Sequence, residues 1–216
     1  KATAALCVKR PAGAKKLAPA VNNILPALGM PGGKFAVSQA LPPNPQSHGA
    51  ESITFDVTLN EGMERRPLAR VASGGELSRL MLALKVVLAS HDVVPTLVFD
   101  EVDQGIGGEV GGRIGAALKD VSREGRQALV ITHLPQIAVY ADQQLVVEKG
   151  KKGGVATSDV QVASGEGRVK EIARMLGDAD MATARRHAVE LLRTASEQSA
   201  SPPETPSPLA PTRPRP

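Results

Sequence analysis

Between residues 71 and 136 the chain contains three short motifs, which read VASGGELSR (71–79), LVFDEVD (97–103) and LVITHLPQ (129–136). The first is typical of a helix start, because Ser73 followed three residues later by Glu76 forms a capping box. Gly74 and Gly75 leave the first backbone N–H groups of this helix bare, which together with the positive end of the helix dipole suits a phosphate. An ordinary N-cap is the competing interpretation of the same four residues. An apolar face with helical spacing follows, made of Leu77, Leu80, Met81, Leu84 and Leu88.

Two carboxylates, Asp100 and Glu101, follow the apolar run Leu97–Phe99. Such a run is typical of a strand buried on both faces, as in a parallel sheet. Ligands of open α/β sheets lie beyond the carboxyl ends of such strands. One carboxylate can therefore help to hold Mg²⁺, while its neighbour on the opposite side of the strand can polarise a water. The alternative is the start of a solvated loop, which the preceding apolar residues disfavour.

A histidine, His133, follows a second apolar run at residues 128–132. The two runs with the helix between them predict a right-handed βαβ unit, in which both strands end at the same edge of the sheet. A lone histidine is more often structural, but this one is predicted to share an edge with Asp100 and Glu101. The helix is predicted from the spacing of Val110, Ile114, Ala117, Leu118 and Val121.

Together these motifs resemble the carboxyl-terminal head lobe of the RecN family, bacterial DNA-repair ATPases related to SMC proteins and ABC-type ATPases. The resemblance covers residues 15–195, and the residues THLPQ at 132–136 narrow it from the ABC/SMC class to RecN. It implies that the signature motif, which closes over ATP held by a partner head, is Ser73, Gly74, Gly75 and Glu76. It also implies a Walker B aspartate for Mg²⁺, a catalytic glutamate, a D-loop aspartate and a switch histidine, which would be Asp100, Glu101, Asp103 and His133.

The resemblance further implies an α/β fold, the carboxyl-terminal lobe of an ABC/SMC-type ATPase head with a mostly parallel sheet flanked by helices and the end of a coiled-coil arm. The implied cofactors are ATP and Mg²⁺. The implied partners are DNA, the protein's own amino-terminal head lobe and a second copy joined through ATP-bound heads. The implied role is ATP hydrolysis during double-strand break repair and recombination, in the bacterial cytoplasm at the nucleoid.

The domain organisation predicted from the sequence has three parts. Residues 1–33 are interpreted as a remnant of the coiled-coil arm, residues 34–195 as the head lobe, and residues 196–216 as a disordered tail rich in Pro, Ser and Thr. Because an interior proline costs a helix about 3 kcal/mol, we expect a helix from about Pro19 and irregular structure over residues 1–13.

The rest of the lobe is predicted as strands, turns and helices around the motifs. Strands are expected at residues 34–40 and 53–59, and a hairpin at 144–148 and 155–162 around a turn at 149–154. A helix is expected to end at Gly177, and another is marked by Ala184, Ala188, Leu191 and Leu192. A Gly-rich bend at 103–112 matches no nucleotide-loop pattern; a loop at a dimer interface and a plain strand-to-helix turn remain open.

Composition sets limits on the kind of protein. The 216 residues are 42% hydrophobic, enough for a sizeable core, and carry a formal charge of +4. Six basic residues precede the first acidic one, Glu51, and this stretch could meet phosphates, although a charge run is usually a solvated face. The single cysteine, Cys7, permits no internal disulfide, as expected in a reducing cytoplasm. No apolar run approaches the length of about 18 residues that a membrane span needs, and no signal peptide is evident.

A phosphate-binding P-loop is missing from the sequence. The nearest stretch, Gly32-Gly33-Lys34-Phe35, lacks the first glycine and the hydroxyl residue. In the RecN family this loop lies in an amino-terminal lobe, so we expect a fragment that carries the second half of a split site.

Two alternatives to an ATPase head lobe of the RecN type remain open. One is a transporter ATPase subunit, disfavoured because Glu76 stands where such subunits typically have Gln; the other is a non-catalytic interaction module, which predicts ATP-independent association.

The isolated chain is expected to hydrolyse no ATP, because it lacks the Lys and Ser/Thr groups that bind the β- and γ-phosphates and Mg²⁺. Phosphate release by the purified chain measures this directly. Turnover that Glu101→Gln abolished would contradict the prediction, whereas turnover insensitive to that change would identify a contaminating ATPase.

Overall fold

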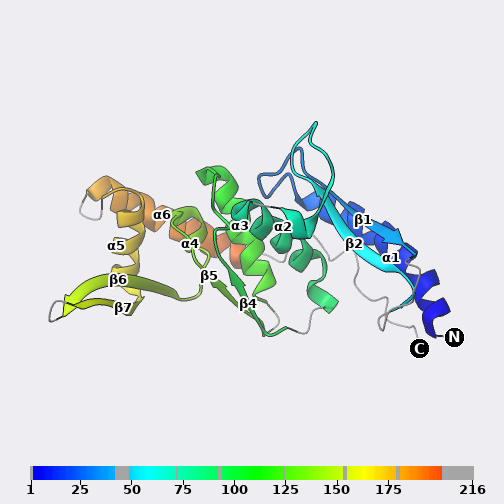
Figure 1. Ribbon diagram of the computed structural model, residues 1–216. Helices are drawn as coiled ribbons and strands as arrows, with labels where there is room; N and C mark the ends of the chain where they lie inside the picture. Colours follow the sequence, from blue (N-terminus) through cyan, green and yellow to red (C-terminus); the bar gives the residue numbers. More distant parts are fainter. Residues whose placement is uncertain are drawn as a thin grey trace, which may run out of the picture. The chain divides into compact units, whose positions relative to one another are not determined.

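The computed structural model describes residues 2–41, 49–71, 73–91, 94–123, 125–152, 155–178 and 181–200. Its helices are α1 (Ala2–Ile24), α2 (Gly74–Val87), α3 (Gly108–Val121), α4 (Pro135–Ala138), α5 (Gly165–Met175) and α6 (Ala182–Ala200), with short 3-10 turns η1 (Leu68–Arg70) and η2 (Ala89–His91). Its strands are β1 (Lys34–Ala40), β2 (Ser52–Thr58), β3 (Arg66–Pro67), β4 (Thr96–Phe99), β5 (Gln127–Val130), β6 (Gln144–Lys152) and β7 (Val155–Ala163) (Figure 1). Among these residues no helix combines the length and the apolar character that a membrane crossing needs.

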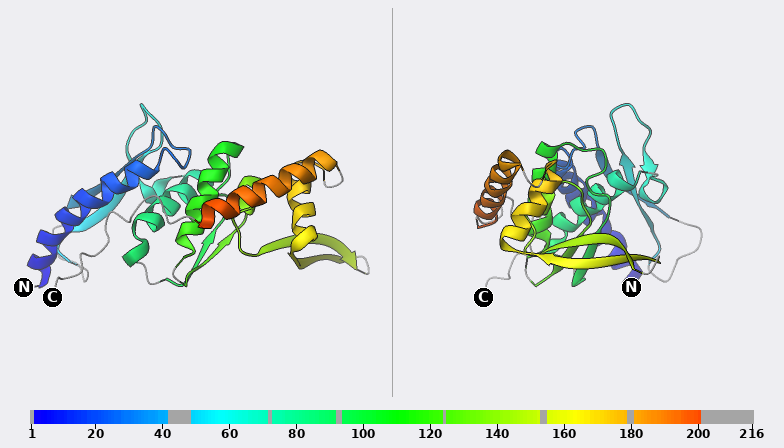
Figure 2. Two further views of the ribbon diagram at one scale, coloured as in Figure 1. Left: turned by 180° about the vertical axis from the view of Figure 1, so that it is seen from behind. Right: turned by 90° about the vertical axis from the view of Figure 1, so that its left-hand side faces the viewer.

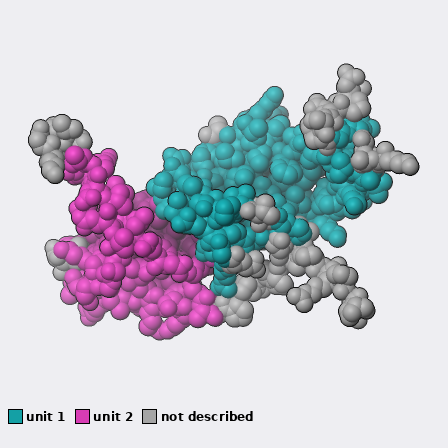
Figure 3. All heavy atoms as spheres, turned by 90° about the horizontal axis from the view of Figure 1, so that it is seen from below, with its two compact units in different colours: residues 1–106, 120–131, 203–216 teal, residues 107–119, 132–202 magenta. Residues whose placement is uncertain are grey.

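The chain divides into two compact units (Figure 3). That residues 34–195 form one head lobe stays a prediction. The first unit comprises Lys1–Ile106 and Asp120–Ile131, and the second comprises Gly107–Lys119 and Thr132–Pro202. The chain therefore passes between the units within the stretch that carries the three motifs.

In the first unit, α1 is one continuous helix that includes Pro11 and Pro19. The expectation of irregular structure over residues 1–13 is therefore wrong. Long-range contacts offset the hydrogen bonds that the prolines remove, since Arg10 forms an ion pair with Glu51 at 3.6 Å and the far end of the helix is buried. That α1 is the end of a coiled-coil arm stays a prediction.

The strands predicted at residues 34–40 and 53–59 are confirmed as the antiparallel pair β1–β2, with Phe35 opposite Val57. Asn22 of α1 secures this sheet through both backbone groups of Phe35: its side-chain amide donates to the Phe35 carbonyl oxygen at 3.1 Å, and the Phe35 N–H donates to Asn22 Oδ1 at 2.6 Å. Figure 1 shows α1 running along this sheet, and α1 also contacts α2. The helix of the first motif, α2, therefore packs against α1, which in turn packs against the β1–β2 sheet.

The strands β4 and β5 are parallel, with Phe99 opposite Val130. The Ile131 N–H donates to the Phe99 carbonyl oxygen at 3.0 Å, so the two carboxyl ends lie side by side. The expected burial on both faces is wrong, because Leu97 and Phe99 are buried while Val98 is 66% exposed. The mostly parallel sheet is wrong too, since the described sheets are small and mostly antiparallel and β4–β5 is their one parallel pair. No described element covers the face that carries Val98.

The second unit joins the β6–β7 hairpin to the helices α4, α5 and α6 (Figure 2). Its core is built from α4, α5 and α6 and contains Ala138, Val139, Ile172, Ala173, Ala188 and Ala195. As predicted, α5 stops just before Gly177, which has a positive φ of 129°. The predicted turn at 149–154 is corrected in part, because β6 continues through Lys152, which pairs with Val155.

The boundary of the predicted tail also moves. Disorder was expected from Ser196 onward, but α6 continues to Ala200. Its last turns are held by tertiary contacts, since Ala195 is buried and Gln198 accepts a hydrogen bond from the Tyr140 hydroxyl. The remainder of the predicted tail lies outside the described residues.

Candidate functional site

The start of α2 has the cap that the sequence predicts. Ser73 is the extended N-cap residue (φ −87°, ψ 118°), and its Oγ accepts a hydrogen bond from the Glu76 N–H at 3.4 Å. The Ser73 carbonyl oxygen accepts from Leu77 N at 3.1 Å, which closes the first helical turn. Glu76 lies in that first turn, where its charge is favourable with the positive end of the helix dipole.

The loop after β4 is hydrogen-bonded to the first two turns of α2. The Gly75 N–H donates to Gln104 Oε1 at 3.2 Å, and the Arg79 guanidinium donates to the Gln104 carbonyl oxygen at 2.8 Å. The Ser78 hydroxyl donates to the Asp100 carbonyl oxygen at 2.6 Å. The first two sequence motifs are therefore hydrogen-bonded to each other within one chain.

The two glycines at the start of α2 are required by the close approach of this loop. A Cβ added at Gly74 would overlap the carboxylate of Glu101. A Cβ added at Gly75 would lie 2.8 Å from Gln104 Cβ and 3.0 Å from the Gln104 carbonyl oxygen. The glycines thus leave room for the loop, in addition to leaving the first backbone N–H groups of α2 uncovered by side chains of their own.

Gly75→Ala is therefore expected to destabilise the protein by about 1–3 kcal/mol, because the added methyl group meets backbone atoms that cannot move aside cheaply. Gly112→Ala is the matched control, since its Cβ would enter open space and alanine favours a helix over glycine by up to about 1 kcal/mol. Denaturant unfolding of the two variants measures both effects. Equal stability of the two variants would contradict the close packing at Gly75.

The backbone is strained at Glu101, the one non-glycine residue among those described with a positive φ, at 56°. This left-handed conformation costs an ordinary residue about 1–2 kcal/mol, and such strain clusters at functional sites. The Glu101 N–H donates to Asp100 Oδ1 at 2.9 Å. Both carboxylate residues are exposed, while the next residue, Val102, is fully buried and anchors the loop.

The Gly-rich bend has the form of a strand-to-helix turn, with Gly105 at φ 73° and α3 beginning at Gly108. Asp103, the predicted D-loop aspartate, is 4% exposed and faces inward in this chain. Its role at an interface between two heads stays a prediction.

The predicted metal ligand at this loop is Asp100. The described residues include no cluster of three or more His, Cys, Asp or Glu that could enclose a metal. Mg²⁺ in nucleotide sites typically uses one or two carboxylates, with waters and substrate phosphates completing the shell. The exposed carboxylate of Asp100 at the end of β4 suits that arrangement.

The hydrogen bonds between α2 and the loop after β4 involve three residues to which the sequence alone assigns no role. These residues are Ser78, Arg79 and Gln104. Burial lowers the pKa of the Arg79 guanidinium, while the nearby Glu76 carboxylate raises it. Helical spacing was an available signal, because Ser78 and Arg79 lie one turn after Gly74 and Gly75 and so share their face. Nothing in the sequence pointed to Gln104.

His133 belongs to the second unit and is exposed. The turn that carries it is fixed locally, because Thr132 Oγ1 accepts a hydrogen bond from the Leu134 N–H at 3.0 Å. The helix α4 begins at Pro135, two residues after His133. That His133 shares an edge with Asp100 and Glu101 stays a prediction.

The similarity of this chain to known proteins extends beyond the three motifs. No family model matches the chain. The chain is 45% identical over 204 residues to the DNA repair protein RecN of Streptomyces coelicolor, a match that covers 88% of this chain. It is 43% identical over 201 residues to RecN of Treponema pallidum, covering 90% of the chain. This chain is a RecN homologue.

The RecN homologue spans about a third of the length of these relatives, namely 36% of the Streptomyces coelicolor protein and 35% of the Treponema pallidum protein. A third relative, RecN of Mycobacterium leprae, is 48% identical over 150 residues, which is 68% of the chain. Among solved structures, the Smc head domain with a coiled coil and joint from Pyrococcus yayanosii matches with a TM-score of 0.50 and 21% identity over 84% of the chain. The fold of the RecN homologue is therefore mixed α/β and resembles an SMC head domain.

Proposed function

We propose that this chain is the carboxyl-terminal half of an SMC-like ATPase head that binds and hydrolyses ATP between two heads during DNA double-strand break repair. The observation that carries the proposal is the loop of Asp100–Gln104, which is hydrogen-bonded to the glycine-rich start of α2 and holds Glu101 in a strained conformation. The relatives' name, DNA repair protein RecN, supports the biological role. It also disfavours the transporter alternative.

In this proposal the start of α2 receives the phosphates of ATP held by a partner head. The bare N–H groups and the positive helix end supply the attraction, and the capping hydroxyl of Ser73 lies at the same position. The groups that would make this contact are Ser73, Gly74, Gly75 and Glu76.

Hydrolysis itself would depend on the residues that follow the parallel strands. Glu101 would act as the general base for the attacking water, and His133 would contact the γ-phosphate. Asp100 would hold Mg²⁺, which when bound with ATP neutralises phosphate charge. Asp103 would lie at the boundary between the two heads, and α1 would continue into a coiled-coil arm.

The present arrangement places the Glu101 carboxylate beside Gly74, at the end of α2 that is to receive a phosphate. A carboxylate and a phosphate repel each other at short range, and both favour the positive end of the helix. We therefore infer that the Glu101 side chain turns away from Gly74 when the partner's nucleotide approaches.

A full-length protein that contains this chain tests the proposal. Light scattering should show monomers with ADP and dimers with ATP, and phosphate release should require Mg²⁺ and rise with linear double-stranded DNA. The remaining alternative is a non-catalytic interaction module, which predicts equal association with and without ATP and no phosphate release. That outcome would overturn the proposal.

A further inference from the structure

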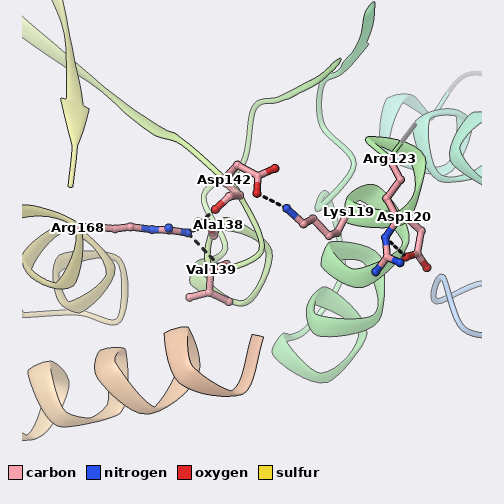
Figure 4. Close-up of polar contacts among 8 residues, drawn as sticks. Lys119, Asp120, Arg123, Ala138, Val139, Asp142 and Arg168 are labelled. Atoms are coloured by element: carbon pink, nitrogen blue, oxygen red, sulfur yellow. Dashed lines mark hydrogen bonds and ion pairs between the residues drawn. The ribbon is translucent and has the colours of Figure 1, made fainter. Parts of the chain in front are cut away.

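An arginine of α5 binds the carboxyl end of α4, the short helix that follows His133. α4 has only four residues, and the chain leaves the helix at once, so carbonyl groups at and just after its carboxyl end need partners from elsewhere. Arg168 of α5 supplies them, because its Nη2 donates to the carbonyl oxygens of Ala141 at 2.7 Å, Val139 at 3.1 Å and Ala138 at 3.4 Å (Figure 4). A cationic donor at this point also complements the negative end of the helix.

The opposite side of the same segment lies against bare backbone of α3. Gly108, Gly111 and Gly115 follow one another at helical spacing on one face. A Cβ at Gly111 would lie 3.3 Å from Leu134 Cδ1, and one at Gly115 would overlap the Tyr140 ring. The glycines therefore let the chain that follows His133 approach α3 closely.

An ion pair fastens the far end of the segment. Lys119 of α3 pairs with Asp142 (Figure 4). Asp142 also acts on Arg168, since its charge raises the pKa of the Arg168 guanidinium while burial, the larger effect, lowers it. The segment from Leu134 to Asp142 therefore lies against α3 along its length, and Arg168 ties its carboxyl end to α5.

We propose that Arg168 is a positioning residue for His133, holding the turn that carries the histidine at a fixed distance from α3 and α5. The inference rests on the proposed function, in which His133 contacts the γ-phosphate. His133 is exposed and directly precedes Leu134, the N-cap of α4. The backbone of His133 is continuous with this segment, which Arg168 binds through three carbonyl groups.

An arginine suits this task better than a lysine. Its planar guanidinium stays charged despite burial and offers several donors in a fixed geometry. A lysine keeps the charge but presents a single flexible ammonium group, so it should reach fewer of the three carbonyl oxygens.

The test uses the full-length protein with Arg168→Gln, Arg168→Lys and a matched control, Arg174→Gln. Arg174 lies on the same helix, and its exposed side chain pairs with its neighbour Glu171. Arg168→Gln should lower turnover at saturating ATP about tenfold, with the KM for ATP and ATP-driven dimerisation changed less than about twofold, because a displaced catalytic group costs rate rather than binding. Arg168→Lys should recover part of the rate, and Arg174→Gln should match the parent.

Two further measurements separate positioning from a general loss of structure. In a His133→Ala background, Arg168→Gln should cause no additional loss of turnover, because residues that act through one another are non-additive. Hydrogen exchange of the backbone amides in residues 132–142 should become faster in Arg168→Gln and stay unchanged in Arg174→Gln. A full additional loss in the His133→Ala background, or unchanged exchange and turnover in Arg168→Gln, would overturn the inference.

The test also distinguishes failure of the inference from failure of the proposed function. If His133→Ala leaves turnover at the parent rate, the catalytic role proposed for His133 is wrong and the inference falls with it. If His133→Ala slows turnover but Arg168→Gln does not, only the inference fails. If Arg168→Gln does not fold, Asp142→Asn provides a second variant, because it weakens the ion pair of Lys119 with Asp142 at an exposed side chain. It should lower turnover by a smaller factor, and it should cause no additional loss in the His133→Ala background.

Discussion

Glu101→Gln is expected to reduce ATP turnover of the full-length protein by about 10²–10⁴-fold while ATP-bound dimers accumulate. The amide keeps the size and most of the hydrogen bonding of the carboxylate but cannot take a proton from water. Glutamine adopts the left-handed conformation of residue 101 at a similar cost, so the loop that is bonded to α2 should keep its shape. Binding and dimerisation should therefore survive the loss of chemistry.

The comparison of nucleotide affinity with turnover decides between the roles of neighbouring residues. Asp100→Asn should weaken Mg²⁺-dependent binding, because it removes a charge beside the metal, and His133→Ala should slow hydrolysis without a matching loss of binding. Glu109→Gln is the control, since Glu109 is exposed on α3 and pairs with its neighbour Arg113. Near-parent turnover of Glu101→Gln, or parallel losses of affinity and turnover in all three variants, would show that the separate roles are wrong.

Ser73→Arg in the full-length protein is expected to weaken ATP-driven dimerisation about hundredfold or more, with ATP binding to a single head nearly intact. A long side chain at the N-cap would fill the space through which the partner's γ-phosphate must reach the start of α2. The residues that would hold a nucleotide within the same head are elsewhere, so that binding should persist. Light scattering with and without ATP, together with nucleotide titration, measures the two effects separately.

A milder substitution isolates the contribution of the cap. Ser73→Ala removes the Oγ that accepts from the Glu76 N–H and should cost the helix about 1 kcal/mol without filling the approach to it. Its effect on dimerisation should therefore be much smaller than that of Ser73→Arg. If the two variants dimerise with ATP equally well, Ser73 is only an N-cap and α2 does not receive a partner's phosphate.

Several features of the site were predictable because they depend on neighbours in the sequence. The cap of Ser73 on α2 is a short-range hydrogen bond, and the end of β4 at Phe99 follows from an apolar run that stops at two carboxylates. The second strand was placed wrongly, because β5 ends at Val130 and not at Thr132. The homology to RecN over most of the chain confirms the resemblance that these motifs carried. The roles of the individual site residues remain predictions.

Other features came from contacts between residues far apart in the chain. The bond from Gly75 to Gln104 and the clamp of Arg168 on Val139 each span about thirty residues, and neither has a periodic signal. The buried position of Asp103 likewise depends on how the loop after β4 folds back onto α2. Side-chain position at the site is therefore less predictable than the site's location.

The sequence by itself determined where α2 begins, where β4 ends and which family the chain resembles, because caps, apolar runs and motif spacing are local. Only the tertiary structure decided that α1 continues through Pro11, since the ion pair of Arg10 with Glu51 lies across forty residues of chain. It also decided that Val98 is exposed, because burial of a strand face depends on which element packs over it, and no local pattern encodes that neighbour.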